Sequence, residues 1–260
     1  MTGALDLAER IAGPDLRPRV QAATRALLGR RLAELGWDPV PGEGERVPGL
    51  RSMLIGALGT VGKDGRVRSE AARLFDAARA GGPPVDPDLE SAVLGVVADM
   101  GRDGDFEMFL DRYRHPSTPQ EETRYLMALT AFPDVERCER IFELATSEAR
   151  SADGFLLVRG LLANRVGGPA VWARVKEDWD ALLARLPDPN QAAMVGTVRL
   201  LCADRTLAED VERFLTEHPV HVGQRTVVQT LEQLAVHVAL AERLRSNGRL
   251  AAALEHVPVG

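Results

Sequence analysis

The sequence lacks several features that are typical of disulfide-rich, zinc-ribbon, membrane-spanning and secreted proteins. It contains only two cysteines, Cys138 and Cys202, far apart and in no CxxC pair, which excludes a disulfide-rich scaffold and a zinc ribbon. No apolar run approaches the roughly 18–20 residues that a membrane-spanning helix needs. The amino-terminal residues lack the basic-then-apolar layout of a signal peptide. We therefore predict a cytoplasmic protein with no membrane partner.

The chain also has no excess of positive over negative charge. The chain carries 32 basic and 38 acidic residues, a formal net charge of −6, and its only lysines are Lys63 and Lys176. No net positive field would attract nucleic acid, so we predict no nucleic-acid partner. Arginines in the segment 17–31 could form a local basic face, but Asp15 and Glu34 favour a balanced, solvated one.

Motifs typical of catalytic and metal sites are missing from the sequence. It has neither HExxH nor a GxSxG nucleophile elbow. His218 and His221 are the only close pair of histidines, and no third ligand or glutamate base lies nearby in sequence. We therefore predict no catalytic residue, no metal ligand and no cofactor-binding residue in this chain.

One glycine-rich stretch superficially resembles a phosphate-binding loop. It contains Gly56, Gly59, Gly62 and Lys63, but the Walker spacing fails and no strand is predicted before it. We interpret these glycines as positions that allow close helix packing and then end a helix.

The apolar residues recur at helical spacing, and strand-like alternation never lasts more than a few residues. The series Trp172, Val175, Trp179, Leu182 and Leu186 predicts one helix of four turns. The two tryptophans could stack on a ligand, but this spacing favours a place in the core. Aromatic residues make up only 5% of the chain.

Several segments between the apolar stripes carry signals for helix starts and stops. Thr118-Pro119-Gln120-Glu121 and Thr206-Leu207-Ala208-Glu209 both have the pattern of a capping box, and Asp86-Pro87 has that of an N-cap followed by proline. Gly36 and Gly101 are typical helix stops. These breaks divide the chain into roughly twelve helices with short connections.

This pattern predicts an all-α fold, an α-solenoid of stacked antiparallel helix pairs similar to a HEAT or armadillo superhelix. We expect one helical-repeat domain over residues 1–260. It would comprise a helical hairpin at 1–36, a loop at 37–48 and stacked pairs over 49–255. A compact, irregular helix bundle is the alternative, because no clean repeat consensus is visible.

Several short strings occur in an order and spacing that resemble the C-terminal helical domain of the gluzincin zinc aminopeptidases, of the puromycin-sensitive and aminopeptidase N type. The resemblance covers about residues 25–254 and departs locally at Glu90 and Leu94. The strings are Leu35-Gly36-Trp37-Asp38-Pro39, Pro41-Gly42-Glu43, Leu50-Arg51, Ala71-Ala72-Arg73-Leu74-Phe75, Gln120-Glu121-Glu122, Val171-Trp172-Ala173 and Val211-Glu212.

The resemblance implies a non-catalytic role. In this family the HExxH zinc site and the GxMEN motif belong to an upstream catalytic domain, and neither motif occurs here. Zinc is therefore expected only in that absent domain, and the chain is expected to be inactive alone and to begin inside the family's C-terminal domain. The resemblance further implies that the helical domain walls the peptide-substrate chamber and packs on the catalytic domain.

A free-standing α-solenoid that binds a peptide or protein on its concave face is the alternative function. The catalytic domain of the same aminopeptidase and peptide substrate are the expected partners. Helix position suggests Arg124, Tyr125 and Arg159 as peptide-facing residues. Arg124 could equally be a structural ion-pair partner of Glu121, three residues earlier.

Overall fold

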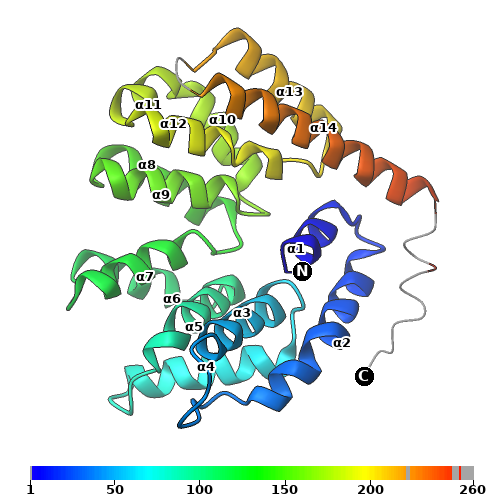
Figure 1. The fold of residues 1–260 in the computed structure, drawn as a ribbon. Coiled ribbons are helices and arrows are strands. Elements are labelled where there is room, and N and C mark those ends of the chain that lie inside the picture. The colour runs from blue at the N-terminus through cyan, green and yellow to red at the C-terminus, as the bar shows by residue number, and fades with distance from the viewer. Residues whose placement is uncertain (1, 221–222, 248–251, 253–260) are drawn as a thin grey trace. The chain divides into compact units, whose positions relative to one another are not determined.

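The structure is a computed structural model that describes residues 2–220, 223–247 and 252. These residues form fourteen α-helices and one short 3-10 helix, with no strand among them (Figure 1). The predicted all-α fold is confirmed. None of the helices in this part of the chain is long and apolar enough to cross a membrane.

The helices fall into two compact units. In the first unit, the irregular segment between the second and third helices ends at Val47, where the third helix begins. The superhelical arrangement of the pairs and the single-domain organisation stay predictions.

The helices of the first unit are α1 (Thr2–Ile11), α2 (Arg17–Leu35), α3 (Val47–Thr60), α4 (Gly65–Arg79), α5 (Pro87–Met100), α6 (Asp105–Arg114) and α7 (Pro119–Leu129).

The second unit contains the remaining helices. Its first three helices, α8 to α10, pack on one another, and α12 packs on α9. The helices of this unit are α8 (Val135–Ser147), α9 (Ser151–Leu162), α10 (Gly168–Glu177), α11 (Trp179–Arg185), α12 (Asp188–Val195), α13 (Arg205–Glu217) and α14 (Gln224–Asn247), with the 3-10 helix at Val198–Leu200.

Helix α3 lies at the centre of the first unit, where it packs on α2 and α5, while α4 packs on α5. Ile55 of α3 and Val93, Val96 and Val97 of α5 are fully buried between these helices. Removing their apolar surface from water favours the stacked arrangement, because each helix alone would leave this face exposed.

The approach of α3 to α5 depends on a glycine. A methyl group built on Gly59 would lie 2.8 Å from Cγ1 and 3.1 Å from Cβ of Val96. A methyl group on Gly56, three residues earlier in the same helix, would meet no atom within 4 Å. The packing role predicted for this glycine stretch therefore holds at Gly59 and does not extend to Gly56.

The structure confirms two of the predicted helix starts. At α7, the hydroxyl of Thr118 accepts a hydrogen bond from the Glu121 amide at 3.1 Å, and the Glu121 carboxylate accepts one from the Ser117 amide at 2.7 Å. At α5, the Asp86 carboxylate accepts a hydrogen bond from the Asp88 amide at 2.9 Å. These acceptors satisfy amides that the first helical turn cannot pair internally.

Two sequence predictions about helix limits were wrong. Helix α13 is capped by Asp204, whose carboxylate accepts a hydrogen bond from the Thr206 amide at 2.8 Å, so Thr206 lies inside the helix and is not the cap. A carboxylate satisfies the orphan amides and also suits the positive end of the helix dipole. The predicted four-turn helix around the tryptophans is interrupted at Asp178, a residue type with low helix propensity, and forms α10 and α11.

The two tryptophans belong to the core of the second unit. Trp172 and Trp179 are 1% and 5% exposed, and both rings meet the ring of Phe214 edge-on, with centroids 5.5 and 5.2 Å apart. Phe214 lies on α13, so this aromatic group joins α10 and α11 to α13, beyond α12 in the chain. The core interpretation of the tryptophans is confirmed.

Candidate functional site

Tyr125, one of the predicted peptide-facing residues, lies in the core of the first unit. It is 8% exposed, and its ring meets the ring of Phe109 edge-on, with centroids 5.1 Å apart. Burial raises the pKa of Tyr125 to about 12, so the phenol stays protonated near neutral pH.

Arg124 has a structural partner, as the alternative interpretation expected, but that partner is Glu90 and not Glu121. One guanidinium nitrogen lies 2.6 Å from the Glu90 carboxylate, and another donates to the Pro87 carbonyl at 3.2 Å. Glu121 pairs instead with Arg112, at 3.5 Å. Burial raises the pKa of Glu90 against the attraction of Arg124. Arg124 therefore holds the middle of α7 on the start of α5.

Arg159 is exposed on α9, in the second unit. Arg124 and Tyr125 are neighbours on α7, in the first unit. Peptide contact by these three residues stays a prediction.

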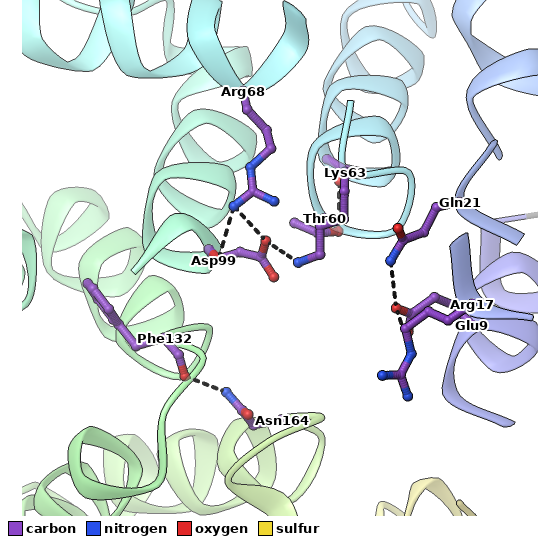
Figure 2. Close-up of polar contacts among 10 residues, drawn as sticks. Glu9, Arg17, Gln21, Thr60, Lys63, Arg68, Asp99, Phe132 and Asn164 are labelled. Atoms are coloured by element: carbon purple, nitrogen blue, oxygen red, sulfur yellow. Dashed lines mark hydrogen bonds and ion pairs between the residues drawn. The ribbon is translucent and has the colours of Figure 1, made fainter. Parts of the chain in front are cut away.

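A cluster of positive charge surrounds the turn between α3 and α4. No pattern in the sequence indicated that these cations lie together. Lys63 Nζ lies 2.5 Å from the Asp99 carboxylate, and an Arg68 nitrogen lies 3.6 Å from the same oxygen and donates to the Asp99 carbonyl at 3.3 Å. Arg25 of α2 donates to the Gly62 carbonyl at 2.6 Å. Figure 2 shows the side chains of Lys63 and Arg68 both reaching toward Asp99. We call Arg25, Lys63 and Arg68 the cationic turn.

Local backbone geometry positions the cationic turn. Lys63 has a φ of 47°, the only positive φ at a non-glycine residue among those the structure describes. Asp64 then caps α4 by accepting hydrogen bonds from the amides of Arg66 and Val67 at 2.9 and 3.0 Å. A side chain held at positive φ costs conformational energy, and such residues are enriched at functional sites.

Figure 2 also shows two further groups of polar contacts, one in each unit. In the first unit, Glu9 of α1 lies 3.6 Å from Arg17 and accepts a hydrogen bond from Gln21 at 3.4 Å, with both partners on α2. In the second unit, the Asn164 side chain donates to the carbonyls of Thr130 and Phe132, each at 2.9 Å. These contacts hold loops and helix ends in place.

The second lysine makes a similar contact in the second unit. Lys176 Nζ lies 2.6 Å from the Asp210 carboxylate, which also accepts hydrogen bonds from the Trp172 indole at 2.9 Å and from Arg213 at 2.5 Å. Burial opposes ionisation of Asp210, but the hydrogen bonds from Lys176 and Trp172 outweigh it and lower the pKa.

Asp210→Asn should lower the free energy of unfolding by about 1–3 kcal/mol at neutral pH, because Lys176 and the Trp172 indole lose a charged acceptor. The folded-state pKa of Asp210 is lowered, so its contribution is present above the unfolded-state value near 4 and is lost as pH falls below it. The difference between variant and wild type should therefore shrink between about pH 5 and pH 2. Urea unfolding at several pH values measures it. Asp180→Asn, at an exposed position of α11, is the control. A difference that stays constant with pH would contradict the assignment.

Other candidates for chemistry have structural surroundings. Cys138 is 1% exposed, and burial raises the pKa of its thiol to about 12. The exposed His218 ring stacks on Phe214, with centroids 4.2 Å apart. His221, its predicted neighbour, lies outside the described residues. Within the described ranges, no three His, Cys, Asp or Glu side chains gather in a way that could hold a metal ion.

The fold and these contacts define a class of protein: an all-α domain of packed helices, in which several polar side chains join one helix or loop to another. The model of the ERAP1-like C-terminal domain family matches residues 2–236, and the chain belongs to this family. The resemblance to the C-terminal domain of zinc aminopeptidases is thereby confirmed.

The similar curated proteins are aminopeptidases. Aminopeptidase M1-B of rice is 28% identical over 249 residues, which cover 92% of this chain and 28% of that protein. The alanine/arginine aminopeptidase of Saccharomyces cerevisiae is 25% identical over 225 residues, which cover 85% of this chain and 26% of that protein. The chain thus spans about a quarter of the length of these relatives.

Proposed function

We propose that this chain is a non-catalytic domain of a zinc aminopeptidase that walls the peptide chamber and packs on the catalytic domain of the same enzyme. The observation that carries the proposal is the family match over residues 2–236, together with relatives that are aminopeptidases. The proposal places the zinc ion and the bond-breaking step in the catalytic domain, as the family resemblance implies.

Exposed apolar side chains support docking against another domain. Val228 and Val236 of α14 are 56% and 64% exposed, and they lie eight residues apart on one side of the helix. Apolar surface of this kind is more favourable when a partner covers it. Peptide would contact a different part of the surface, where polar and charged side chains are available.

Antibodies against this chain should precipitate zinc-dependent aminopeptidase activity from extracts of the source organism. We expect the activity to belong either to one longer polypeptide or to a separate catalytic chain held by this one, and a denaturing immunoblot distinguishes the two. The purified 260-residue chain should hydrolyse no aminoacyl p-nitroanilide, with or without added zinc.

Two results would contradict the proposal. Zinc-dependent hydrolysis by the purified chain would place catalysis in this chain itself. A precipitate that contains this chain but no aminopeptidase activity would instead favour the free-standing scaffold that binds a peptide or protein.

A further inference from the structure

The loop between α6 and α7 presents one serine to solvent. It comprises residues 115–118, and Ser117 is exposed in it. The amide of Ser117 donates to the Glu121 carboxylate at 2.7 Å, but its hydroxyl has no hydrogen-bond partner among the residues that the structure describes. This hydroxyl is therefore available to a reagent that approaches from solvent.

Two arginines precede this serine at a defined spacing. Arg114 lies three residues before Ser117 and Arg112 lies five residues before it, which gives the pattern R-x-R-x-x-S. Both arginines lie in the last turn of α6 and are exposed. Arginine-directed protein kinases recognise this charge pattern, because acidic side chains of the kinase pair with the guanidinium groups while the hydroxyl enters the active site.

The sequence and the fold distinguish Ser117 from the other candidates. Ser69, Thr216 and Ser246 also have an arginine three residues before them, but none has a second arginine at the fifth position, and all three lie in helices. A kinase binds the residues around its target as an extended segment, so a hydroxyl inside a helix is reached only after the helix unfolds locally. Ser117 requires only the last turn of α6 to unwind, and helix ends fray readily.

A carboxylate already occupies the place that a phosphate on Ser117 would take. One oxygen of Glu121 accepts the hydrogen bond from the Ser117 amide, and the other lies 3.5 Å from the guanidinium of Arg112. Arg112 is therefore within reach of a group bonded to Ser117. A phosphate carries about −1.5 to −2 charges at neutral pH and pairs strongly with a guanidinium, so it would compete with Glu121 for Arg112.

We propose that Ser117 is a phosphorylation site for an arginine-directed protein kinase, and that the phosphate takes Arg112 from Glu121. In the reaction, Oγ of Ser117 attacks the γ-phosphorus of ATP, and the bond from this phosphorus to the oxygen that bridges it to the β-phosphorus breaks. ADP leaves, and the hydroxyl proton passes to the kinase. Because Glu121 belongs to the capping box of α7, the modification exchanges a contact at the start of this helix. The proposal is independent of the proposed function.

The purified 260-residue chain, incubated with Mg²⁺, ATP and the catalytic subunit of cyclic-AMP-dependent protein kinase, tests the site directly. We expect mass spectrometry to find one added phosphate, about 80 Da, on Ser117 and none on Ser69. Ser117→Ala should abolish the incorporation, and Arg114→Gln should slow it about tenfold. Arg30→Gln, which removes the same charge from an exposed position of α2, should leave the rate unchanged.

The pH titration of the ³¹P NMR signal tests the contact with Arg112. A guanidinium beside a phosphoserine favours its doubly charged form and so lowers the pKa of its second ionisation. We expect the midpoint to lie about 0.5 pH unit lower in the phosphorylated wild type than in phosphorylated Arg112→Gln. The other charged groups near the loop, which are Glu121, Arg114 and the pair of His115 with Asp111, are the same in both proteins.

Two results would overturn the phosphorylation site: no phosphate on Ser117 of the folded chain, or equal phosphorylation of Ser117 and Ser69. A synthetic peptide of residues 109–121 is the positive control for the kinase, so phosphorylation of the peptide alone counts against the site in the folded protein. Equal ³¹P midpoints in the wild type and Arg112→Gln would overturn the contact assigned to Arg112.

Discussion

Replacing Arg51 with methionine should lower the free energy of unfolding by about 3 kcal/mol, the upper end of what a hydrogen-bonded charged group contributes. Arg51 is 1% exposed. Its terminal nitrogens donate to the two Glu43 oxygens at 3.1 and 2.6 Å, and its Nε donates to the Gly36 carbonyl at 3.1 Å. The variant leaves the Glu43 carboxylate and the Gly36 carbonyl without this donor, so the segment between α2 and α3 loses its attachment to α3.

Urea unfolding followed by circular dichroism measures this effect. Arg46→Met, at an exposed position just before α3, is the matched control and should change stability by no more than about 0.5 kcal/mol. The hydrogen bonds from Arg51 also lower the pKa of Glu43, so the contribution of the pair is lost as pH falls through that lowered value. A loss below about 1 kcal/mol for Arg51→Met would show that the pair contributes little.

Gly59→Ala should destabilise the first unit by about 3 kcal/mol, at the upper end of what overpacking usually costs. The added methyl group would overlap the side chain of Val96, which is fully buried. Val96 is β-branched and cannot rotate away without a strained side-chain angle, so α3 and α5 must move apart. Thermal unfolding should show a clearly lower midpoint than in the wild type.

Gly56→Ala supplies the control for this substitution within the same helix. No atom lies within 4 Å of the added methyl group, and alanine favours a helix over glycine by about 0.5–1 kcal/mol, so this variant should be more stable than the wild type. Combining Gly59→Ala with Val96→Ala should recover part of the loss, because the overlapping methyl groups are gone. Equal effects of the two glycine substitutions would contradict the close packing of α3 on α5.

Some of the short strings that pointed to the family contain residues that contact one another across the fold. Arg51 of one string bonds to Glu43 and Gly36 of two others. Trp172 of another string meets Phe214, which lies two residues after the Val211-Glu212 string. These strings therefore include residues that join a helix to a connecting segment or to another helix.

The candidate site was much less predictable from the sequence. Asp99 lies 36 residues from Lys63, and Gly62 lies 37 residues from Arg25. No local pattern links residues this far apart, because their distance in space depends on how α2, α3 and α5 stack. The positive φ of Lys63 could not be predicted from the sequence either, because lysine is not a residue type that signals such a turn.

By itself the sequence determined the helical class and the burial of the tryptophans, because helical periodicity and the balance of apolar and charged residues are local properties. It also contained the strings that identify the family. Only the tertiary structure decided that Glu90 is the partner of Arg124, that Gly59 and not Gly56 is the close contact, and that Lys63 and Arg68 meet the same carboxylate. Each of these depends on the distance and rotation between packed helices, which side-chain volumes set and which no single segment of the sequence specifies.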